Sequence, residues 1–419
     1  MRRMLGPLAA VALSLLAPLT APALEPTFAS IAGERFGAWD TDRDGLLSAG
    51  EIDTLCIDPS VKGEEAAAVA SLKRIIRSGR YAVPPLTREY LSTAAPAARS
   101  PAPRADADRQ DSGEVTAPTT GAPALRTPNF QSSFASSVRR IRSTKRDLFA
   151  DETPDLDRCR QGPLGNCYFV AAIGAAVHRD PGSVTSMITP QADGSYLVRF
   201  ATSEAVAVPP LTDAELALSG TTGDEGLWLP VLEKALGLLR IDANPERYTT
   251  RTATDAIANG GSTSTIIRML TNHQTARITL KRRPRSTDKG PDGKPIELPP
   301  VPAGDPADLA RKVRADVADA IREQRLVACS TGVEKLPPGI SPKHAYAIIA
   351  MSQEDDTLTL WNPHGNTVRP RGEPGPTNGY HTRAGVFTVP ISEFVTIFSG
   401  VVIETDTPAP RPKPAPTAN

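Results

Sequence analysis

The sequence has little of several features that would narrow its function at once. Its 47 basic and 47 acidic side chains cancel, so there is no electrostatic reason to expect nucleic acid or an anionic membrane as the main partner. Four cysteines are too few for a disulfide scaffold. No repeat of solenoid period is present. What remains, over 419 residues, is room for two or three domains that each bury a core.

Long apolar runs are also missing, apart from one near the N-terminus. Arg2 and Arg3 precede the short apolar stretch 8–16, and Ala21-Pro22-Ala23 forms an A-x-A site. This pattern predicts a secretory signal peptide over residues 1–23 and an exported mature chain, periplasmic or secreted, with no membrane span after its removal. If Cys167 stays free, at most one disulfide can form among the cysteines that remain, Cys56, Cys159 and Cys329.

Composition divides the rest of the chain. Residues 24–92 are expected to form a small helical module, with Val69, Leu72, Ile75 and Ile76 on one helical stripe and a stop at Gly79. Alanine, proline, serine and threonine dominate residues 93–128, which we expect to be a disordered linker.

A second globular region is predicted over residues 129–405, followed by a disordered tail over 406–419. Helical patterns such as "LARKVRADVADAIREQ" alternate there with short strand-like runs such as "SYLVRF", "RLVACST" and "HAYAIIAM". The proline-rich stretch that begins "KRRPRSTDKGPDGKP" is expected to be a surface loop.

The segment "DTDRDGLLSAGE" has the spacing of a calcium-binding EF-hand loop. The ligands would be the carboxylates of Asp40, Asp42 and Asp44, the carbonyl of Leu46, Ser48 at position 9 and the closing Glu51, and Gly45 would form the sharp turn. Calcium needs six or more oxygen ligands, and this spacing brings them around one point. The alternative is an acidic turn that binds no metal.

No second loop of this quality follows. The segment "DPSVKGEEAAAV" begins with an aspartate but lacks acids at positions 3, 5 and 12, so it could at most be a degenerate partner of the first loop. Calcium is plentiful outside the cytosol, so we expect the ion to stabilise the module rather than to act as a transient signal.

A lone thiol follows a glycine-rich turn in "QGPLGNCYF". Val170, Ile173 and Val177 recur after it at helical spacing, which places Cys167 in the first turn of a helix. The helix dipole there is expected to lower the pKa of the thiol and favour the thiolate nucleophile. The alternative is a buried, inert cysteine.

A thiol nucleophile needs a base, and the base needs a group that orients it. Of the five histidines, His178 is expected to face away, and His273 and His381 lie in polar segments. His344 opens a strand-like run, and Asn362 ends the next one. Two antiparallel strands would bring these two residues together, in the order Cys, His, Asn of papain-type thiol proteases.

At this point the sequence resembles a known family. "QGPLGNCYFVAA" is similar to the active-site segment QGxLGDCWFLAA of calpain-type cysteine proteases, and the chain is identified as a bacterial-style member with an N-terminal EF-hand. The resemblance covers roughly residues 145–400, in family order, through the following segments: "LFADETP", "GLWLPVLEKAL", "NGGST", "LVACST", "KHAYAI", "LWNPHGN" and "GVFTVPISEFVTIF".

The resemblance implies an α+β fold, with a helical lobe and a β-rich lobe of papain type behind the small EF-hand module. It implies that Cys167 is the nucleophile, His344 the general base and acid, and Asn362 the orienter. It also implies that Gln161 donates its side-chain amide to the oxyanion, together with the backbone N–H of Cys167. Animal calpains bind two further calcium ions in the core, whose ligands the resemblance does not assign to residues of this chain.

Three positions depart from the family pattern. Asn166 stands where the family has aspartate, and Tyr168 where it has tryptophan. His364 replaces the tryptophan of NPWG, which shields the site from water in relatives, and it brings a rival histidine next to Asn362.

The sequence thus predicts an exported, calcium-binding cysteine endopeptidase that acts on proteins or peptides, of undetermined oligomeric state. A transglutaminase-like acyl transferase could use the same three residues. A calcium-dependent binding protein with an inactive protease fold is the non-enzymatic alternative. Amine incorporation without cleavage would identify the first, and failure to react with an epoxide thiol inhibitor the second.

Overall fold

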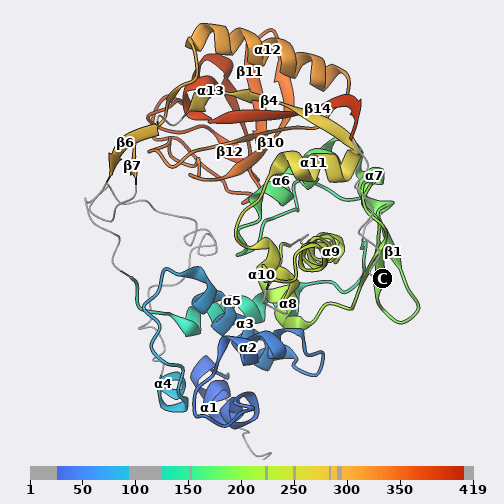
Figure 1. Cartoon of the computed structure of the whole chain (residues 1–419), viewed down its shortest axis with the longest axis vertical. Helices are drawn as coiled ribbons and strands as arrows, with labels where there is room; N and C mark the ends of the chain where they lie inside the picture. Colours follow the sequence, from blue (N-terminus) through green and yellow to red (C-terminus); the bar gives the residue numbers. More distant parts are fainter. Residues whose placement is uncertain are drawn as a thin grey trace, which may run out of the picture.

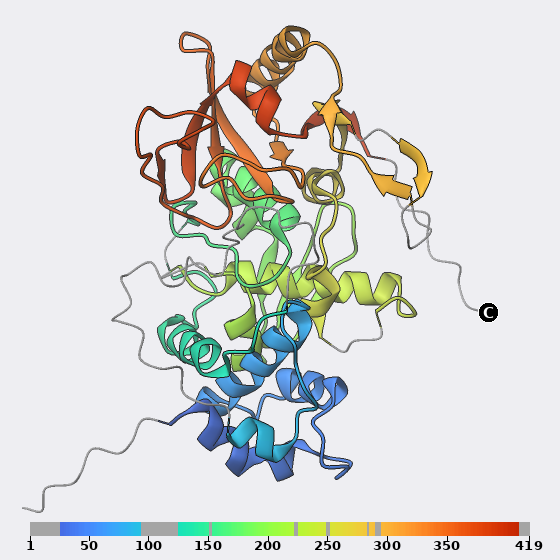
Figure 2. The same cartoon turned by 90° about the vertical axis from the view of Figure 1, so that its left-hand side faces the viewer.

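The computed structural model describes residues 26–93, 125–150, 153–221, 225–248, 252–282, 285–289 and 295–409. The predicted signal peptide, most of the predicted linker and the end of the predicted tail lie outside these ranges. Figure 1 shows the first helices at one end, a second group of helices in the middle and a twisted sheet at the other end, and the view in Figure 2 agrees. The mixed α+β class predicted from the sequence is confirmed.

The N-terminal helices form where the sequence supplies caps and an apolar face. Thr27 and Ser48 each close a capping box, and Gly79 ends the third helix with a left-handed φ of 62°. The predicted stripe from Val69 to Ile76 faces the core of this region. The helices are α1 (Phe28–Trp39), α2 (Ala49–Ile57), α3 (Gly63–Ser78) and α4 (Arg88–Ser92).

Two later helices share the core of this module. Phe130, Phe134 and Ile141 of α5 (Phe130–Ser143) and Ala217 and Leu218 of α8 pack into the same hydrophobic cluster as α1–α4. The rings of Phe28 and Phe130 stack with their centroids 4.8 Å apart. The predicted borders at residues 92 and 129 therefore do not coincide with the limits of one hydrophobic core, because residues on both sides of the linker bury their apolar faces together.

Charged groups also link this module to the middle of the molecule. The buried ammonium of Lys73 in α3 pairs with Asp53 of α2 and with Asp255 of α10, which also pairs with Arg77 at 3.2 Å. The hydroxyl of Thr212 donates to the carbonyl of Cys56 at 2.6 Å. A buried ammonium is costly to leave unpaired, so these contacts fix the module against α10.

The central helices pack around α6, which carries Cys167 at its first position. Gly174 in the middle of α6 leaves space for the ring of Trp361, where a Cβ atom would collide with the indole, so α6 packs closely on the sheet. The central elements are α6 (Cys167–Arg179), α7 (Pro181–Thr185), α8 (Asp213–Leu218), α9 (Trp228–Ala243), α10 (Ala253–Ile257) and α11 (Thr263–Thr271), with the small sheet β1 (Ile188–Pro190), β2 (Tyr196–Val198) and β3 (Val206–Val208).

A seven-stranded antiparallel sheet in the order β12-β13-β11-β10-β9-β14-β4 forms the other end of the molecule. Helices α12 (Pro306–Arg322) and α13 (Ile391–Ile397) pack on it around a second core. Its strands are β4 (His273–Thr279), β9 (Val327–Ser330), β10 (Ala345–Ser352), β11 (Thr357–Trp361), β12 (Thr382–Arg383), β13 (Val386–Pro390) and β14 (Gly400–Pro408).

Three local expectations were wrong. The predicted surface loop after residue 280 contains two short antiparallel pairs, β5 (Lys281–Arg282) with β8 (Val301–Pro302) and β6 (Arg285–Lys289) with β7 (Pro295–Glu297). Strand β14 continues into the predicted disordered tail, because Pro408 pairs with His273.

The third concerns the end of the predicted linker. The backbone N–H of Arg126 donates to the carbonyl of Arg80, and its own carbonyl accepts from Ala82, so this part of the segment is ordered on the helical module.

Among the residues that the structure describes, every helix is too short or too polar to span a bilayer. All four cysteines lie in the described part of the chain and are free thiols.

Candidate active site

The glycines before Cys167 allow the chain to pass close to two other backbones. A Cβ atom on Gly162 would collide with the carbonyl of Ser219, and one on Gly165 with the carbonyl of Ala258. The carbonyl of Gly165 also accepts from the backbone N–H of Gly260 at 3.0 Å. The glycine-rich turn is therefore packed against its neighbours, and it sets the direction in which α6 begins.

Cys167 itself is half-buried at the first turn of α6. Burial raises the pKa of its thiol, and backbone hydrogen bonds from Ala345, Tyr168 and Cys167 itself oppose this without reversing it. The expectation that the helix dipole lowers this pKa was wrong, because desolvation outweighs it in this arrangement. The contact with Ala345 also places the thiol at the start of β10, directly after His344.

His344 and Asn362 are brought together by two neighbouring strands, as the sequence predicts. His344 directly precedes β10, Asn362 directly follows β11, and Ala347 of β10 pairs with Trp361 of β11. The Nε2 atom of His344 lies 2.8 Å from Oδ1 of Asn362. Both side chains are buried.

The hydrogen bonds of Asn362 identify the tautomer of His344. The backbone N–H of His364 donates to Oδ1 of Asn362 at 3.0 Å, and Nδ2 of Asn362 donates to Oδ1 of Asn366 at 3.1 Å. The amide oxygen therefore faces the imidazole, so Nε2 must carry the proton and donate. This leaves Nδ1 of His344 with a lone pair that can accept a proton.

His364, the departure from the family pattern, stacks directly on His344. Their ring centroids are 4.2 Å apart and the ring planes differ by 9°. Burial lowers the pKa of His364 to about 4. The pKa of His344 is well below its usual value because the ring is buried and because His364 is adjacent, although the hydrogen bond to Asn362 acts in the opposite direction. Both imidazoles are therefore neutral near pH 7.

Gln161 connects the two sides of this site. Its backbone N–H donates to the carbonyl of Pro363 at 2.7 Å, next to Asn362, and its side-chain Nε2 donates to the carbonyl of Leu164 at 2.6 Å. Among the described residues, its buried Oε1 atom has no hydrogen-bond partner. The side chain is thus held in the turn before Cys167, with its amide engaged by that turn.

The remaining histidines lie away from this group. His178 and His381 are exposed. The Nδ1 atom of His273 lies 2.7 Å from Oε1 of the buried Glu404.

Tyr168, another departure from the family pattern, donates its hydroxyl to the carbonyl of Ile257 at 3.3 Å, and its ring lies 4.9 Å below the guanidinium of Arg240. It thereby attaches the first turn of α6 to α10.

The predicted calcium loop connects α1 and α2, the two helices expected to flank it. One oxygen each from Asp40, Asp42 and Asp44 lie within 4.8 Å of one another. Gly45 has a φ of 83°, which only glycine adopts without strain, and its N–H donates to Oδ2 of Asp40 at 3.0 Å. Among the described residues, the buried Oδ1 atom of Asp40 has no hydrogen-bond partner.

Glu51 closes the loop from the other side. Its Oε1 atom accepts from the backbone N–H of Thr41 at 2.6 Å, and its Oε2 atom accepts from that of Ser48 at 2.9 Å. Burial opposes ionisation, but the hydrogen bonds from Ser48 and Thr41 outweigh it and lower the pKa of this carboxyl group. An ionised Glu51 and an unpartnered Asp40 oxygen fit a hard cation such as calcium.

The partner of this loop is not the segment that the sequence suggests. The backbone N–H of Leu47 donates to the carbonyl of Leu86 at 3.0 Å. Leu86 lies in the segment 79–87 between α3 and α4, whereas the candidate "DPSVKGEEAAAV" becomes a turn and the first part of α3. The loop thus pairs with a segment that has no acidic side chain.

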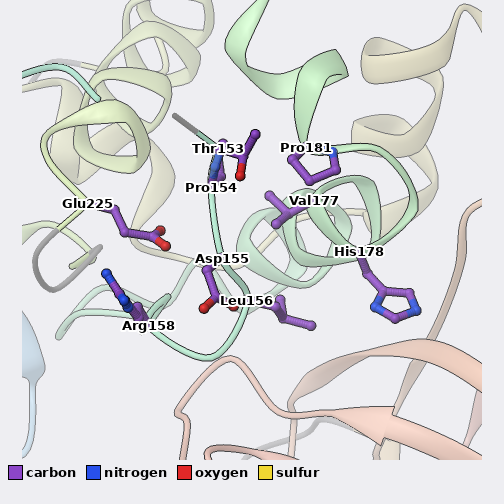
Figure 3. Close-up of a pocket in the computed structure, with 9 residues that line it drawn as sticks. All are labelled: Thr153, Pro154, Asp155, Leu156, Arg158, Val177, His178, Pro181 and Glu225. Atoms are coloured by element: carbon purple, nitrogen blue, oxygen red, sulfur yellow. The ribbon is translucent and has the colours of Figure 1, made fainter. Parts of the chain in front are cut away.

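A second acidic pocket, which sequence reasoning missed, lies at the side of α6. Figure 3 shows Glu225, Asp155 and Arg158 on one side of it and His178 on the other. Burial raises the pKa of Glu225 to about 7, and the charge of Asp155 adds to this, against opposing hydrogen bonds. Within the described part of the chain, Oε2 of Glu225 is buried without a hydrogen-bond partner. The two carboxylates offer oxygen ligands to a cation.

Another missed residue is Glu233, a carboxylate in the apolar helix α9. Its side chain is fully buried, and its Oε1 atom lies 2.7 Å from Nδ2 of Asn166, the residue before Cys167. The signal that could have found it is an acid within the apolar run "LWLPVLEKAL", because buried carboxylates need dedicated partners.

Comparison with known proteins agrees with the geometry. A search of curated proteins gave no significant match. The family model described as calpain family cysteine protease matches residues 137–372, which contain Gln161, Cys167, His344 and Asn362. The match covers more than half of the chain. The chain therefore belongs to the calpain family of cysteine proteases, and its mixed α+β core is that of a cysteine peptidase.

Proposed function

We propose that the protein is an exported endopeptidase that cleaves protein substrates with a catalytic triad of Cys167, His344 and Asn362. The observation that carries the triad is the 2.8 Å hydrogen bond between His344 and Asn362, next to the backbone that contacts the thiol. Because Nε2 of His344 donates to Asn362, its Nδ1 atom is the proton acceptor. Asn362 keeps the ring in this tautomer and orientation.

The pKa directions indicate how the thiol is activated. The pKa of Cys167 is raised and that of His344 is lowered, so a neutral thiol and a neutral imidazole face the incoming substrate. We therefore infer that proton transfer from Sγ to Nδ1 accompanies attack on the peptide carbonyl, instead of a preformed thiolate–imidazolium pair.

The reaction then has two halves. The Sγ atom of Cys167 bonds to the carbonyl carbon, and the oxyanion accepts from the backbone N–H of Cys167 and from Nε2 of Gln161, which must leave the carbonyl of Leu164. The C–N bond breaks as His344 gives its proton to the leaving amine. In the second half His344 takes a proton from water, whose oxygen bonds to the acyl carbon. The C–S bond then breaks, and His344 returns the proton to Sγ.

Replacement of the nucleophile tests this assignment. Cys167→Ala is expected to abolish casein cleavage and labelling by an epoxide thiol inhibitor, with little change in fold. Cys56→Ala is the matched control, because Cys56 is buried in the N-terminal core and its thiol pKa is raised by burial. Substantial cleavage by purified Cys167→Ala would exclude the assignment. Labelled Cys167 with amine incorporation but no cleavage would indicate an acyl transferase instead.

The proposal includes calcium at the loop of Asp40, Asp42, Asp44, Leu46, Ser48 and Glu51, in a bacterial-style arrangement with an EF-hand before the protease core. The unpartnered oxygen of Asp40 and the clustered carboxylates support it. The loop belongs to the module fixed by Lys73, so the ion is proposed to stabilise the module and its attachment. Calcium would supply positive charge that offsets the repulsion of the loop carboxylates.

Export is proposed from the pattern of residues 1–23. The test is the mass of the mature protein purified from its native host. A chain that begins at Leu24, found outside the cytoplasm, is expected. A full-length chain that stays in the cytoplasm would contradict export.

A further inference from the structure

The buried carboxylate of Glu233 is attached to both ends of the turn that carries the active-site cysteine. Its Oε1 atom accepts from Nδ2 of Asn166 at 2.7 Å, immediately before Cys167. Its Oε2 atom accepts from the backbone N–H of Gly220 at 2.7 Å. The next residue, Thr221, exchanges two backbone hydrogen bonds of 2.8 Å with Arg160, immediately before Gln161.

These hydrogen bonds hold the segment 160–166 at both of its ends. Gln161 and the backbone N–H of Cys167, the two groups that we propose as oxyanion donors, lie at its ends. Asn166 is fully buried and is the N-cap residue of α6, yet its side-chain nitrogen bonds to Glu233 rather than to the helix. The orientation of the first N–H groups of α6 therefore depends on a partner from α9.

The hydrogen bonds indicate that Glu233 acts as a carboxylate. Both of its oxygens accept from N–H groups, so neither is free to carry a proton toward these partners. The pKa of Glu233 is raised because burial outweighs the opposing effects of Asn166, Gly220, the charge of Arg140 and the hydroxyl of Ser219, so the ionised form is inferred from the hydrogen bonds. Arg140 comes from α5 and donates to the carbonyl of Ser219, which brings a cation to this side of the carboxylate.

The neutral amide of Asn166 suits this carboxylate in a way that aspartate would not. Two facing carboxylates would have to share a proton, whereas an amide donates without one. The departure from the family pattern at Asn166 thus has a physical counterpart in the described structure, namely a buried acid that requires a donor.

We propose that Glu233 is a positioning residue for the peptidase reaction. Through Asn166 and Gly220 it holds the backbone of the turn 160–166, from which the side chain of Gln161 and the backbone N–H of Cys167 reach the developing oxyanion. The inference rests on the proposed function, since it assumes that Cys167 is the nucleophile. It concerns the rate of the acylation step rather than substrate affinity, because Glu233 is buried behind the turn and does not reach the substrate.

The first variant to test is Glu233→Gln. Glutamine offers one oxygen to two N–H donors, so either Asn166 or Gly220 loses its acceptor and faces an N–H group. A small displacement of reacting groups costs about two orders of magnitude in rate. We expect kcat for a peptide substrate to fall by roughly 10- to 100-fold while KM stays close to that of the native protein.

The second variant exchanges the two groups and provides the rescue. Asn166→Asp combined with Glu233→Gln lets the glutamine Nε2 donate to the new carboxylate, while the glutamine oxygen accepts from Gly220. All hydrogen bonds are then satisfied, and kcat is expected to return most of the way to the native value. A role limited to overall stability would instead move only the thermal midpoints of the single and double variants, and kcat per folded molecule would stay at the native value in both.

Glu215→Gln is the matched control. Glu215 is also buried, and its side chain accepts from Lys234 and from the backbone of Thr212, which both lie outside the turn 160–166. It is expected to lower the thermal midpoint and to leave kcat unchanged. Each variant is assayed as the full chain, with its thermal midpoint measured alongside.

Two results would overturn the inference. One is folded Glu233→Gln with native kcat, and the other is a loss of kcat that Asn166→Asp does not reverse. If Glu233→Gln fails to fold, Asn166→Ala removes only the amide partner, and native kcat in that variant has the same consequence. An active Cys167→Ala variant would instead refute the proposed function, so the two failures can be told apart.

Discussion

The predicted calcium loop and the proposed active site both group polar atoms around a point, but they do so in opposite ways. The loop takes its carboxylates from twelve consecutive residues, 40–51, and its own backbone holds those of Asp42 and Asp44 in place. The active site takes Cys167, His344 and Asn362 from a helix and two strands that are brought together only by packing.

This difference determines what each region can lose. A change in the loop is expected to act on ion affinity and local stability, because the proposed chemistry takes place elsewhere. A change in the proposed active site is expected to act on rate, because Cys167, His344 and Asn362 are held by cores that do not depend on their polar groups. The residues that connect the two regions, above all Lys73, are where this separation can fail.

The largest expected effect is the loss of the base. His344→Ala should lower kcat/KM by at least about three orders of magnitude, because the thiol pKa is raised and the proposed base that accepts its proton is lost. His364→Ala is the matched control and should retain most of the rate, since its ring stacks on His344 and is not the group proposed to take the thiol proton. The measurement is peptide hydrolysis by both variants.

The reverse result, an inactive His364→Ala and an active His344→Ala, would mean that the base has been misassigned. It would also weaken the comparison between the two regions. The base and Asn362 would then come from one short segment of the chain instead of from two strands.

The next prediction concerns the connection between the regions. Lys73→Met removes the ammonium that pairs with Asp53 and Asp255 and should lower the free energy of unfolding by about 3–5 kcal/mol, because the buried carboxylate of Asp53 loses this cation and Asp255 keeps only its ion pair with Arg77. Arg142→Ala is the control, since its ion pair with Glu64 is exposed and should be worth about 0–1 kcal/mol.

Denaturant unfolding followed by two probes checks this prediction. One probe is the fluorescence of Trp39 in the N-terminal module, read in a background with Trp228→Phe and Trp361→Phe, and the other is peptidase activity. If Lys73→Met separates the two transitions and leaves the activity transition at its native midpoint, the module and the protease are independent units. Coincident shifts would show that they unfold together.

A smaller effect is expected from the loop itself. Glu51→Gln should weaken calcium binding roughly tenfold or more, because the ligand that closes the loop is neutralised. Titration of calcium by calorimetry, with Glu34→Gln as an acidic control outside the loop, measures this. The kcat at saturating calcium should stay near the native value.

The same variant also separates two possible sites. If Glu51→Gln protein still loses activity on chelation and regains it with calcium, a second cation acts in the core, and the pocket of Asp155 and Glu225 is the place to examine. If chelation has no effect beyond lower stability, calcium belongs to the loop alone.

What the sequence predicts correctly is what depends on neighbouring residues. The helical stripe from Val69 to Ile76, the stop at Gly79 and the two helices beside the predicted calcium loop are all set within a few turns of chain. The approach of His344 to Asn362 also follows, because two adjacent strand patterns with a short connection predict an antiparallel pair.

What the sequence misses depends on burial and on distant partners. The direction of the pKa shift of Cys167 was wrong, since the depth of the thiol is set by β10, far along the chain. The sequence around Lys73 and around Asp255 does not predict their ion pair, because each residue taken alone looks like an ordinary exposed charge. The strands β5–β8 are too short and too rich in proline to show an alternating pattern.

The smallest expected effect concerns the stack of the two imidazoles and tests the electrostatic part of the site alone. The base must be neutral to accept the thiol proton, so activity on the acid side falls as His344 becomes protonated. Its lowered pKa places this limb of the pH–rate profile below the ordinary histidine value of 6.5. Burial is the main cause, and the adjacent His364 is the second.

His364→Phe keeps an aromatic ring on His344, so burial is preserved, but it removes the second imidazole. The pKa of His344 should then rise, and the acid limb of kcat/KM should move to higher pH while the plateau near pH 7 stays the same. A profile measured from pH 4 to 8 on the native protein and on His364→Phe decides the matter. An acid limb that stays in place or moves to lower pH would show that His364 only covers the hydrogen bond between His344 and Asn362.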